Sequence, residues 1–163
     1  MDKQEFLEAY DQYADAIFRY CLIRVYDREK ARDLVQDVFI RAWDYIISGK
    51  EIENWKPFLF RIATNLIIDN VRKKQDVISL ETLMETGFDA GKDERSNVDN
   101  YIDGQKIIAA INDLGEIYRV PVYMRYVEDL SPKDIAKVTG ESENVISVRI
   151  HRGLYQLKRM LKQ

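Results

Sequence analysis

The chain has 163 residues, of which 46% are hydrophobic, enough for one ordinary domain or two small ones with packed cores. A single cysteine, Cys21, excludes an intrachain disulfide, and no apolar run approaches the ~18 residues that cross a membrane. The N-terminal residues are polar and acidic, unlike a signal peptide, so we expect a cytoplasmic protein that is not itself a membrane protein.

The net charge of −3 is unevenly distributed. Residues 1–75 hold 13 basic and 13 acidic side chains, residues 76–103 hold 2 and 8, and residues 104–163 hold 10 and 7. From Arg149 to the end there are five Lys or Arg residues and no acid. The C-terminal segment can therefore present cations to phosphates although the whole chain is acidic.

Apolar residues recur every three or four positions through the first 75 residues, which predicts three helices and no strand. The first helix is expected at about 3–25 and the second at about 27–47. A third is opened by Glu53 and Asn54 and ends in the basic run 72–74. We expect an all-α protein with two small helical domains.

Residues 76–103 combine glycine, serine and eight acids with scattered apolar residues, which predicts a flexible acidic linker, with room for a short helix at 79–85. The acidity would either repel DNA from this segment or simply maintain solubility. Helices resume near Gln105, and another is expected at 118–126.

Residues 131–152 predict a helix, a tight turn and a second helix that runs to about Leu161. Ser131 and Ser142 are candidate N-caps, Pro132 suits a first helical position, and Gly140 can adopt the left-handed conformation in the turn. This is the pattern of a helix-turn-helix, whose second helix enters the DNA major groove. A plain helical hairpin is the alternative.

The second helix of this motif has two different faces. One should be buried, and consists of Ile146, Ile150, Leu154, Leu157 and Leu161. Another offers groups that can read base edges, namely Ser147, Val148, His151, Arg152 and Tyr155. Phosphate contacts are expected from Arg149, Lys158, Arg159 and Lys162. An ordinary solvated polar face is the alternative.

Signals for catalysis are weak. Cys21 and His151 are far apart, so zinc-ligand spacing is missing, and neither a nucleophile–base arrangement nor a phosphate-binding glycine loop is evident. We therefore expect a protein that is not an enzyme and needs no metal and no cofactor.

Three stretches, residues 31–43, 55–74 and 114–161, together resemble the extracytoplasmic-function (ECF, group IV) class of bacterial RNA polymerase sigma factors. The resemblance implies that residues 1–75 form sigma region 2, residues 76–103 the linker and residues 104–163 sigma region 4. Core RNA polymerase, through the clamp coiled coil of its largest subunit and its flap, and promoter DNA are then the expected partners. An anti-sigma factor, often membrane-bound in this family, is a further one.

The resemblance also assigns roles to individual residues. Binding of the clamp coiled coil is implied for Asp33, Gln36, Asp37, Ile40 and Arg41. Recognition and melting of the −10 element is implied for Trp55, Arg61, Asn65, Asp69, Arg72, Lys73 and Lys74. Recognition of the −35 element is implied for Lys133, Asn144, Ser147, Val148, Arg149, His151 and Arg152.

Other interpretations of these residues remain open. Asp33, Asp37 and Arg41 stand one turn apart and could instead form an internal ion-pair ladder. Trp55 could stack on a base or lie in the core, whereas we favour the core for Phe58.

The recognition helix departs from the family pattern at its start. The family usually shows Gly-Thr-Val-Lys-Ser-Arg, and this chain has Asn144-Val145-Ile146-Ser147-Val148-Arg149. One charge and two hydroxyls are lost from the DNA-facing turn. We expect a changed −35 preference and weaker autonomous binding to DNA.

Two rival functions use less of the chain. An autonomous helix-turn-helix regulator explains residues 131–162 only, and a protein-interaction module of helical hairpins leaves the basic C-terminal helix unexplained.

Overall fold

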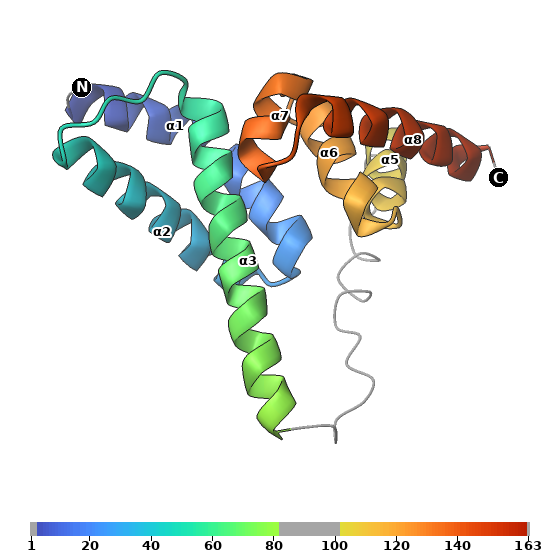
Figure 1. Ribbon diagram of the computed structural model, residues 1–163, viewed down its shortest axis with the longest axis horizontal. Coiled ribbons are helices and arrows are strands. Elements are labelled where there is room, and N and C mark those ends of the chain that lie inside the picture. Colours follow the sequence, from blue (N-terminus) through green and yellow to red (C-terminus); the bar gives the residue numbers. More distant parts are fainter. Residues whose placement is uncertain (1–2, 82–101, 163) are drawn as a thin grey trace. The chain divides into compact units, whose positions relative to one another are not determined.

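The computed structural model describes residues 3–81 and 102–162. These residues are helical with short connections and without strands (Figure 1), which confirms the predicted all-α class. The chain divides into two compact units, Met1–Ala90 and Gly91–Gln163.

The first unit is a bundle of three helices, α1 (Lys3–Val25), α2 (Arg28–Ile47) and α3 (Trp55–Glu81). Each helix packs against the other two. Asp27 caps α2, because its carboxylate accepts hydrogen bonds from the backbone N–H groups of Glu29 and Lys30 at 3.0 and 3.2 Å. The largest of its fully buried side chains include Ile17, Tyr20, Leu59, Phe60 and Ile67, and Cys21 is buried with them.

A buried polar chain joins α1 to α3 inside this core. The hydroxyls of Tyr20 and Thr64 are hydrogen-bonded at 2.9 Å, and Arg24 donates to the Tyr20 hydroxyl at 2.8 Å. Burial raises the pKa of Tyr20 despite the neighbouring Arg24 cation, and it raises the pKa of Cys21 to about 12. The bundle therefore holds both groups in their neutral forms at ordinary pH.

The third helix is longer than predicted. We expected it to end at residues 72–74, but α3 continues to Glu81. A basic run favours the C-terminal end of a helix without stopping it, and the sequence has no glycine or proline between Pro57 and Gly87. Residues 76–81 of the expected linker are thus helical. The short helix expected at 79–85 and the linker character of 82–101 lie outside the described residues, apart from 79–81, which belong to α3.

The second unit consists of α5 (Ile102–Asn112), α6 (Glu116–Tyr126), α7 (Pro132–Thr139) and α8 (Glu143–Leu161). The first of these begins at Ile102 rather than near Gln105. The other three helices all pack on α8. Ile146, Ile150 and Leu157 of the predicted stripe are buried, and Leu154 is half-buried. The prediction was wrong for Leu161, which is 45% exposed, because periodicity fixes its face but not how far the neighbouring helices reach along α8.

A glycine permits the closest approach in this unit. Gly153 on α8 is buried, and a Cβ atom at this position would come within 2.5 Å of Val122 Cγ2 and 3.2 Å of Tyr118 Cβ on α6. Any side chain here would force the two helices apart. Gly153 therefore sets the packing distance on the inner side of the helix whose outer side carries the candidate DNA residues.

Candidate protein and nucleic-acid interfaces

The helix-turn-helix forms through the local contacts expected from the sequence. The Ser131 hydroxyl accepts a hydrogen bond from the Asp134 N–H at 3.1 Å, and the Ser142 hydroxyl accepts one from the Val145 N–H at 3.1 Å. Between the helices, Gly140 has φ of +79° and donates its N–H to the Ala136 carbonyl. These capping contacts fix where α7 ends and α8 begins.

The outer face of α8 carries most of the residues predicted to read the −35 element. Exposed side chains there and on α7 are Lys133, Asn144, Ser147, Val148, His151 and Arg152. Arg149 differs, because its side chain is 28% exposed and pairs with Glu141 in the turn, with Nη1 3.4 Å from Oε1. Further along, Tyr155 is 63% exposed, and the Arg159 guanidinium lies 5.9 Å from its ring centroid.

The residues predicted to act on the −10 element follow α3. Arg61, Asn65 and Asp69 are exposed at intervals of four residues, so they share one face, and Arg72 and Lys73 are exposed beyond them. Lys74 belongs to α3, but its side chain lies outside the part of the chain described.

Two aromatic residues near the start of α3 are only half-buried. Trp55 lies edge-on to Phe6 at 6.3 Å between ring centroids, and Phe58 lies 4.8 Å from Tyr45. Both rings pack on the bundle and also present a surface to solvent. Phe58 therefore packs on the bundle, as favoured, but is half-buried rather than enclosed.

On α2, all five residues predicted to contact polymerase are exposed, and Ile40 is 58% exposed. The opposite face, with Leu34, Val38 and Ala42, is buried in the bundle. Ile40 thus lies on the outside of a helix whose core face is already complete. More than half of the Ile40 side chain is therefore available to a partner.

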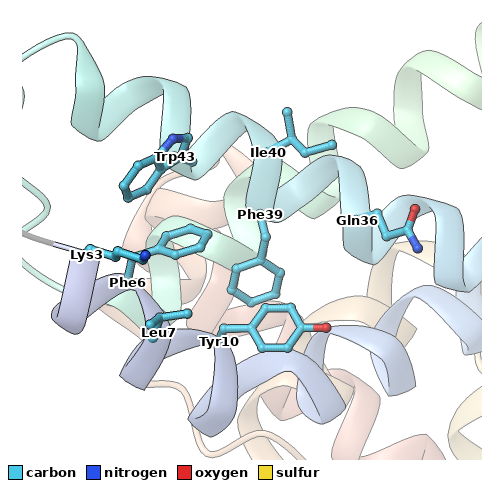
Figure 2. A pocket seen from close by; sticks show the side chains of 8 residues that line it. All are labelled: Lys3, Phe6, Leu7, Tyr10, Gln36, Phe39, Ile40 and Trp43. Atoms are coloured by element: carbon cyan, nitrogen blue, oxygen red, sulfur yellow. The ribbon is translucent and has the colours of Figure 1, made fainter.

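Ile40 borders a groove of about 500 Å³ between α1 and α2 that the sequence analysis did not identify. Figure 2 shows the rings of Phe6, Tyr10, Phe39 and Trp43 gathered between the two helices, with Lys3, Leu7, Gln36 and Ile40 around them. Ring centroids are 5.0 Å apart for Phe6 and Trp43 and 4.8 Å apart for Tyr10 and Phe39. Leu7 and Tyr10 are 45% and 44% exposed, so this apolar surface is open to solvent.

A second, more polar pocket of about 400 Å³ lies where α1, α2 and α3 meet. Asp33 and Asp37 line it together with Arg24, Lys30 and Lys73. The bundle thus brings two carboxylates predicted to contact polymerase to the same pocket as a lysine predicted to contact the −10 element. The two predicted surfaces are adjacent within this unit.

The described residues hold neither a candidate membrane span nor a candidate metal site. No helix among them is long and apolar enough to span a membrane. Residues 3–81 and 102–162 also bring together no group of three or more His, Cys, Asp or Glu side chains that could hold a metal ion.

Comparison with known proteins agrees with this division of the chain. The family model for sigma-70 region 2 matches residues 9–77, and that for sigma-70 region 4 matches residues 104–157. The ECF RNA polymerase sigma factor SigW of Bacillus subtilis is 28% identical over 99% of this chain and 91% of its own length. The ECF sigma factor BldN of Streptomyces coelicolor is 29% identical over 93% of this chain, and the match covers 58% of BldN.

Among solved structures, the sigma factor RpoE in complex with the anti-sigma factor NepR, from Bartonella quintana, has a similar fold. The TM-score is 0.75 at 22% identity, and the match covers 98% of both chains. The two family models together cover most of the chain, in the order of a sigma factor. The chain therefore belongs to the sigma-70 family and is an ECF RNA polymerase sigma factor, an alternative factor that directs RNA polymerase to promoters.

Proposed function

We propose that this sigma factor, a group IV member that works in the cytoplasm, divides its contacts among three surfaces. The α1–α2 groove and the outer edge of α2 bind core polymerase, the exposed face of α3 acts on the −10 element, and the outer face of α8 reads the −35 element. The observation that carries the proposal is the open aromatic groove, whose lining includes Gln36 and Ile40, two of the five exposed α2 residues.

The groove and the α2 edge combine the properties of a protein interface. Ile40 and the Phe39–Trp43 surface offer apolar anchors, and the same helix exposes the charged side chains Asp33, Asp37 and Arg41, of which the two carboxylates line the neighbouring polar pocket. Aromatic anchors surrounded by a polar rim are typical of sites where a few residues supply most of the affinity. The clamp coiled coil of the largest polymerase subunit, a pair of charged helices, has the shape and chemistry to lie along this surface. The polymerase flap is the second proposed contact on the core enzyme.

Promoter melting is assigned to α3. A sigma factor opens DNA without ATP, so it must capture unpaired bases and hold the single strand. Arg61, Asn65 and Asp69 offer hydrogen-bonding groups on one face, and Arg72 and Lys73 add cations next to them. The solvent-facing part of Trp55 can stack on a base while its other side stays against Phe6.

The −35 element is read by α8, with an altered preference. His151 and Arg152 are exposed and keep the family pattern, whereas Val145, Ser147 and Val148 replace a threonine, a cation and a serine. Binding of the holoenzyme to a panel of −35 variants tests this. An unaltered family preference would refute it.

An anti-sigma factor is the proposed regulator. The sigma factor RpoE is solved in complex with the anti-sigma factor NepR, and CnrH, which has a similar fold, in complex with the cytosolic domain of CnrY. We expect an inhibitor, often membrane-bound in this family, to copurify with this chain. Full activity of the factor in cells without any inhibitor would contradict this.

Run-off transcription from a promoter library tests the function directly. Core polymerase is assayed alone and with this protein. New specific transcripts that require the protein are expected. The promoters from which they start report the −10 and −35 preferences together. Tight binding of the free protein to a duplex operator, without new transcripts, would instead support the autonomous regulator.

A further inference from the structure

The ion pair between Glu141 and Arg149 crosses from the turn of the helix-turn-helix to the second turn of α8. The side chains are 44% and 28% exposed, and their charged atoms are 3.4 Å apart. Arg149 aligns with the arginine that the family usually shows at this position, and its proposed role is a contact with a DNA phosphate. Its guanidinium is thus held by a carboxylate of the same chain.

The turn places this carboxylate in a defined position. The Glu141 N–H donates to Thr139 Oγ1 at 3.3 Å, and the Thr139 hydroxyl donates to the Ile135 carbonyl at 3.0 Å. Gly140 before it is fixed in the left-handed conformation, and Ser142 after it caps α8. With its backbone held on both sides, Glu141 reaches Arg149 without ordering a flexible loop, which reduces the entropic cost of the pair.

A carboxylate and a phosphate are competing ligands for one guanidinium. Both are anions that accept hydrogen bonds from the same N–H fork, so Arg149 cannot give its donors fully to both. We propose that Glu141 is an intramolecular competitor of the DNA phosphate for Arg149 and lowers the affinity of region 4 for DNA. This inference rests on the proposed function, because it requires Arg149 to contact DNA.

Removing the carboxylate should therefore strengthen binding, in contrast to the usual effect of breaking an ion pair. Glu141→Gln keeps the size and hydrogen-bonding capacity of the side chain and removes its charge. From the range found for exposed ion pairs, we expect the affinity for DNA to rise about threefold to fivefold at low salt. The gain should shrink as salt rises, since both interactions are screened.

The experiment uses the full chain and a fluorescent duplex of random sequence, because phosphate contacts do not depend on sequence. Affinities are measured for the wild type, Glu141→Gln, Arg149→Gln and the double variant. Glu143→Gln is the matched control, since Glu143 is an exposed acid in the first turn of α8. Circular dichroism checks that every variant keeps its helices.

The expected result is a gain from Glu141→Gln that disappears when Arg149 is already glutamine, whereas Glu143→Gln has the same small effect in both backgrounds. Weaker binding of Glu141→Gln, or an equal gain in both backgrounds, would overturn the competition. If Arg149→Gln weakens binding but Glu141→Gln changes nothing, the inference fails while the proposed DNA contact stands. If Arg149→Gln has no effect on binding, the proposed contact itself fails.

Discussion

The α1–α2 groove of the first unit and the outer face of α8 in the second are opposite kinds of surface. The groove exposes Leu7, Tyr10 and Ile40 beside aromatic rings. The α8 face exposes hydroxyl, imidazole and guanidinium groups, with charge concentrated toward its C-terminal end. Binding at the groove should draw on apolar burial and vary little with salt, whereas binding at α8 should weaken steeply as salt rises.

The interiors behind these surfaces differ as well. The first unit buries the titratable side chains Tyr20 and Cys21 among large apolar residues. The second brings α6 and α8 together at Gly153, where no side chain fits. The second core buries titratable side chains as well, since the Tyr123 hydroxyl donates to Glu128 Oε1 at 3.0 Å. What separates the two cores is the raised pKa of Tyr20 and Cys21 in the first and the close approach at Gly153 in the second.

The largest expected effect is alkaline destabilisation of the first unit. Folding raises the pKa of Cys21 from 9.0 to about 12. The protonated thiol therefore contributes fully to the free energy of unfolding below pH 9, and this contribution is lost as pH rises toward 12. By about pH 11 the free energy of unfolding should have fallen by up to about 3 kcal/mol. The raised pKa of Tyr20 acts in the same direction above pH 10. Urea unfolding followed by tryptophan fluorescence reports on this unit, because both tryptophans, Trp43 and Trp55, lie in it.

A Cys21→Ala variant separates the thiol from other alkaline effects. It should be less stable at neutral pH because of the cavity, but its stability should fall less between about pH 8 and about pH 11. An equal fall in both proteins would show that the thiol does not titrate as expected.

The next largest effect is expected from Gly153→Ala. The added methyl group would meet Val122 Cγ2 at 2.5 Å, so the second unit should lose about 1–3 kcal/mol of unfolding free energy. Helix unfolding followed by circular dichroism should shift, while the tryptophan signal of the first unit stays in place. Gly115→Ala is the control, because its added methyl would only reach ordinary contact, 3.7 Å from Tyr118. Adding Val122→Ala should partly rescue the variant, and no rescue would contradict the proposed clash.

A third prediction concerns the groove. Ile40→Ser should leave the fold intact, since Ile40 is 58% exposed, and should lower affinity for core polymerase about tenfold. Ile47→Ser is matched to it, because Ile47 lies two turns further along α2, is 63% exposed and does not line the groove. Titration of labelled protein with core polymerase measures both. The ratio of the wild-type affinity to the Ile40→Ser affinity should hardly change with salt. If Ile40→Ser and Ile47→Ser lose affinity for core polymerase equally, the groove is not the binding site.

How well the sequence predicted each unit follows from the range of the interactions involved. The helix-turn-helix depends on caps within a few residues, such as Ser131, Gly140 and Ser142, and its boundaries were predicted closely. The groove forms only when Phe6 and Tyr10 meet Phe39 and Trp43, about thirty residues further along the chain. Periodicity within one helix indicates an apolar face but cannot show that a surface shared by two helices stays open.

Two smaller features also depend on contacts that a sequence pattern does not show. The family resemblance implies a polymerase contact for Ile40, and the structure adds that Ile40 is 58% exposed and lines the groove. The Glu141–Arg149 pair was missed because its members are eight residues apart, joined across a turn. One signal in the sequence could have indicated the groove. Ile40 is apolar although it lies outside the stripe of α2 residues that forms the core face.

The smallest effect should come from Lys133, exposed in the first turn of α7. We expect Lys133→Gln to weaken DNA binding about threefold and to reduce the slope of log affinity against log salt by about one, as loss of one phosphate contact would. Lys137→Gln on the same helix removes the same charge one turn away, at a position without a predicted DNA contact, and should leave the slope unchanged. Because a lysine near a helix N-terminus opposes the helix dipole, the Lys133 variant should not lose stability. If the slope of log affinity against log salt is the same for Lys133→Gln and Lys137→Gln, Lys133 makes no phosphate contact of its own. The specific phosphate contacts of this unit would then lie on α8.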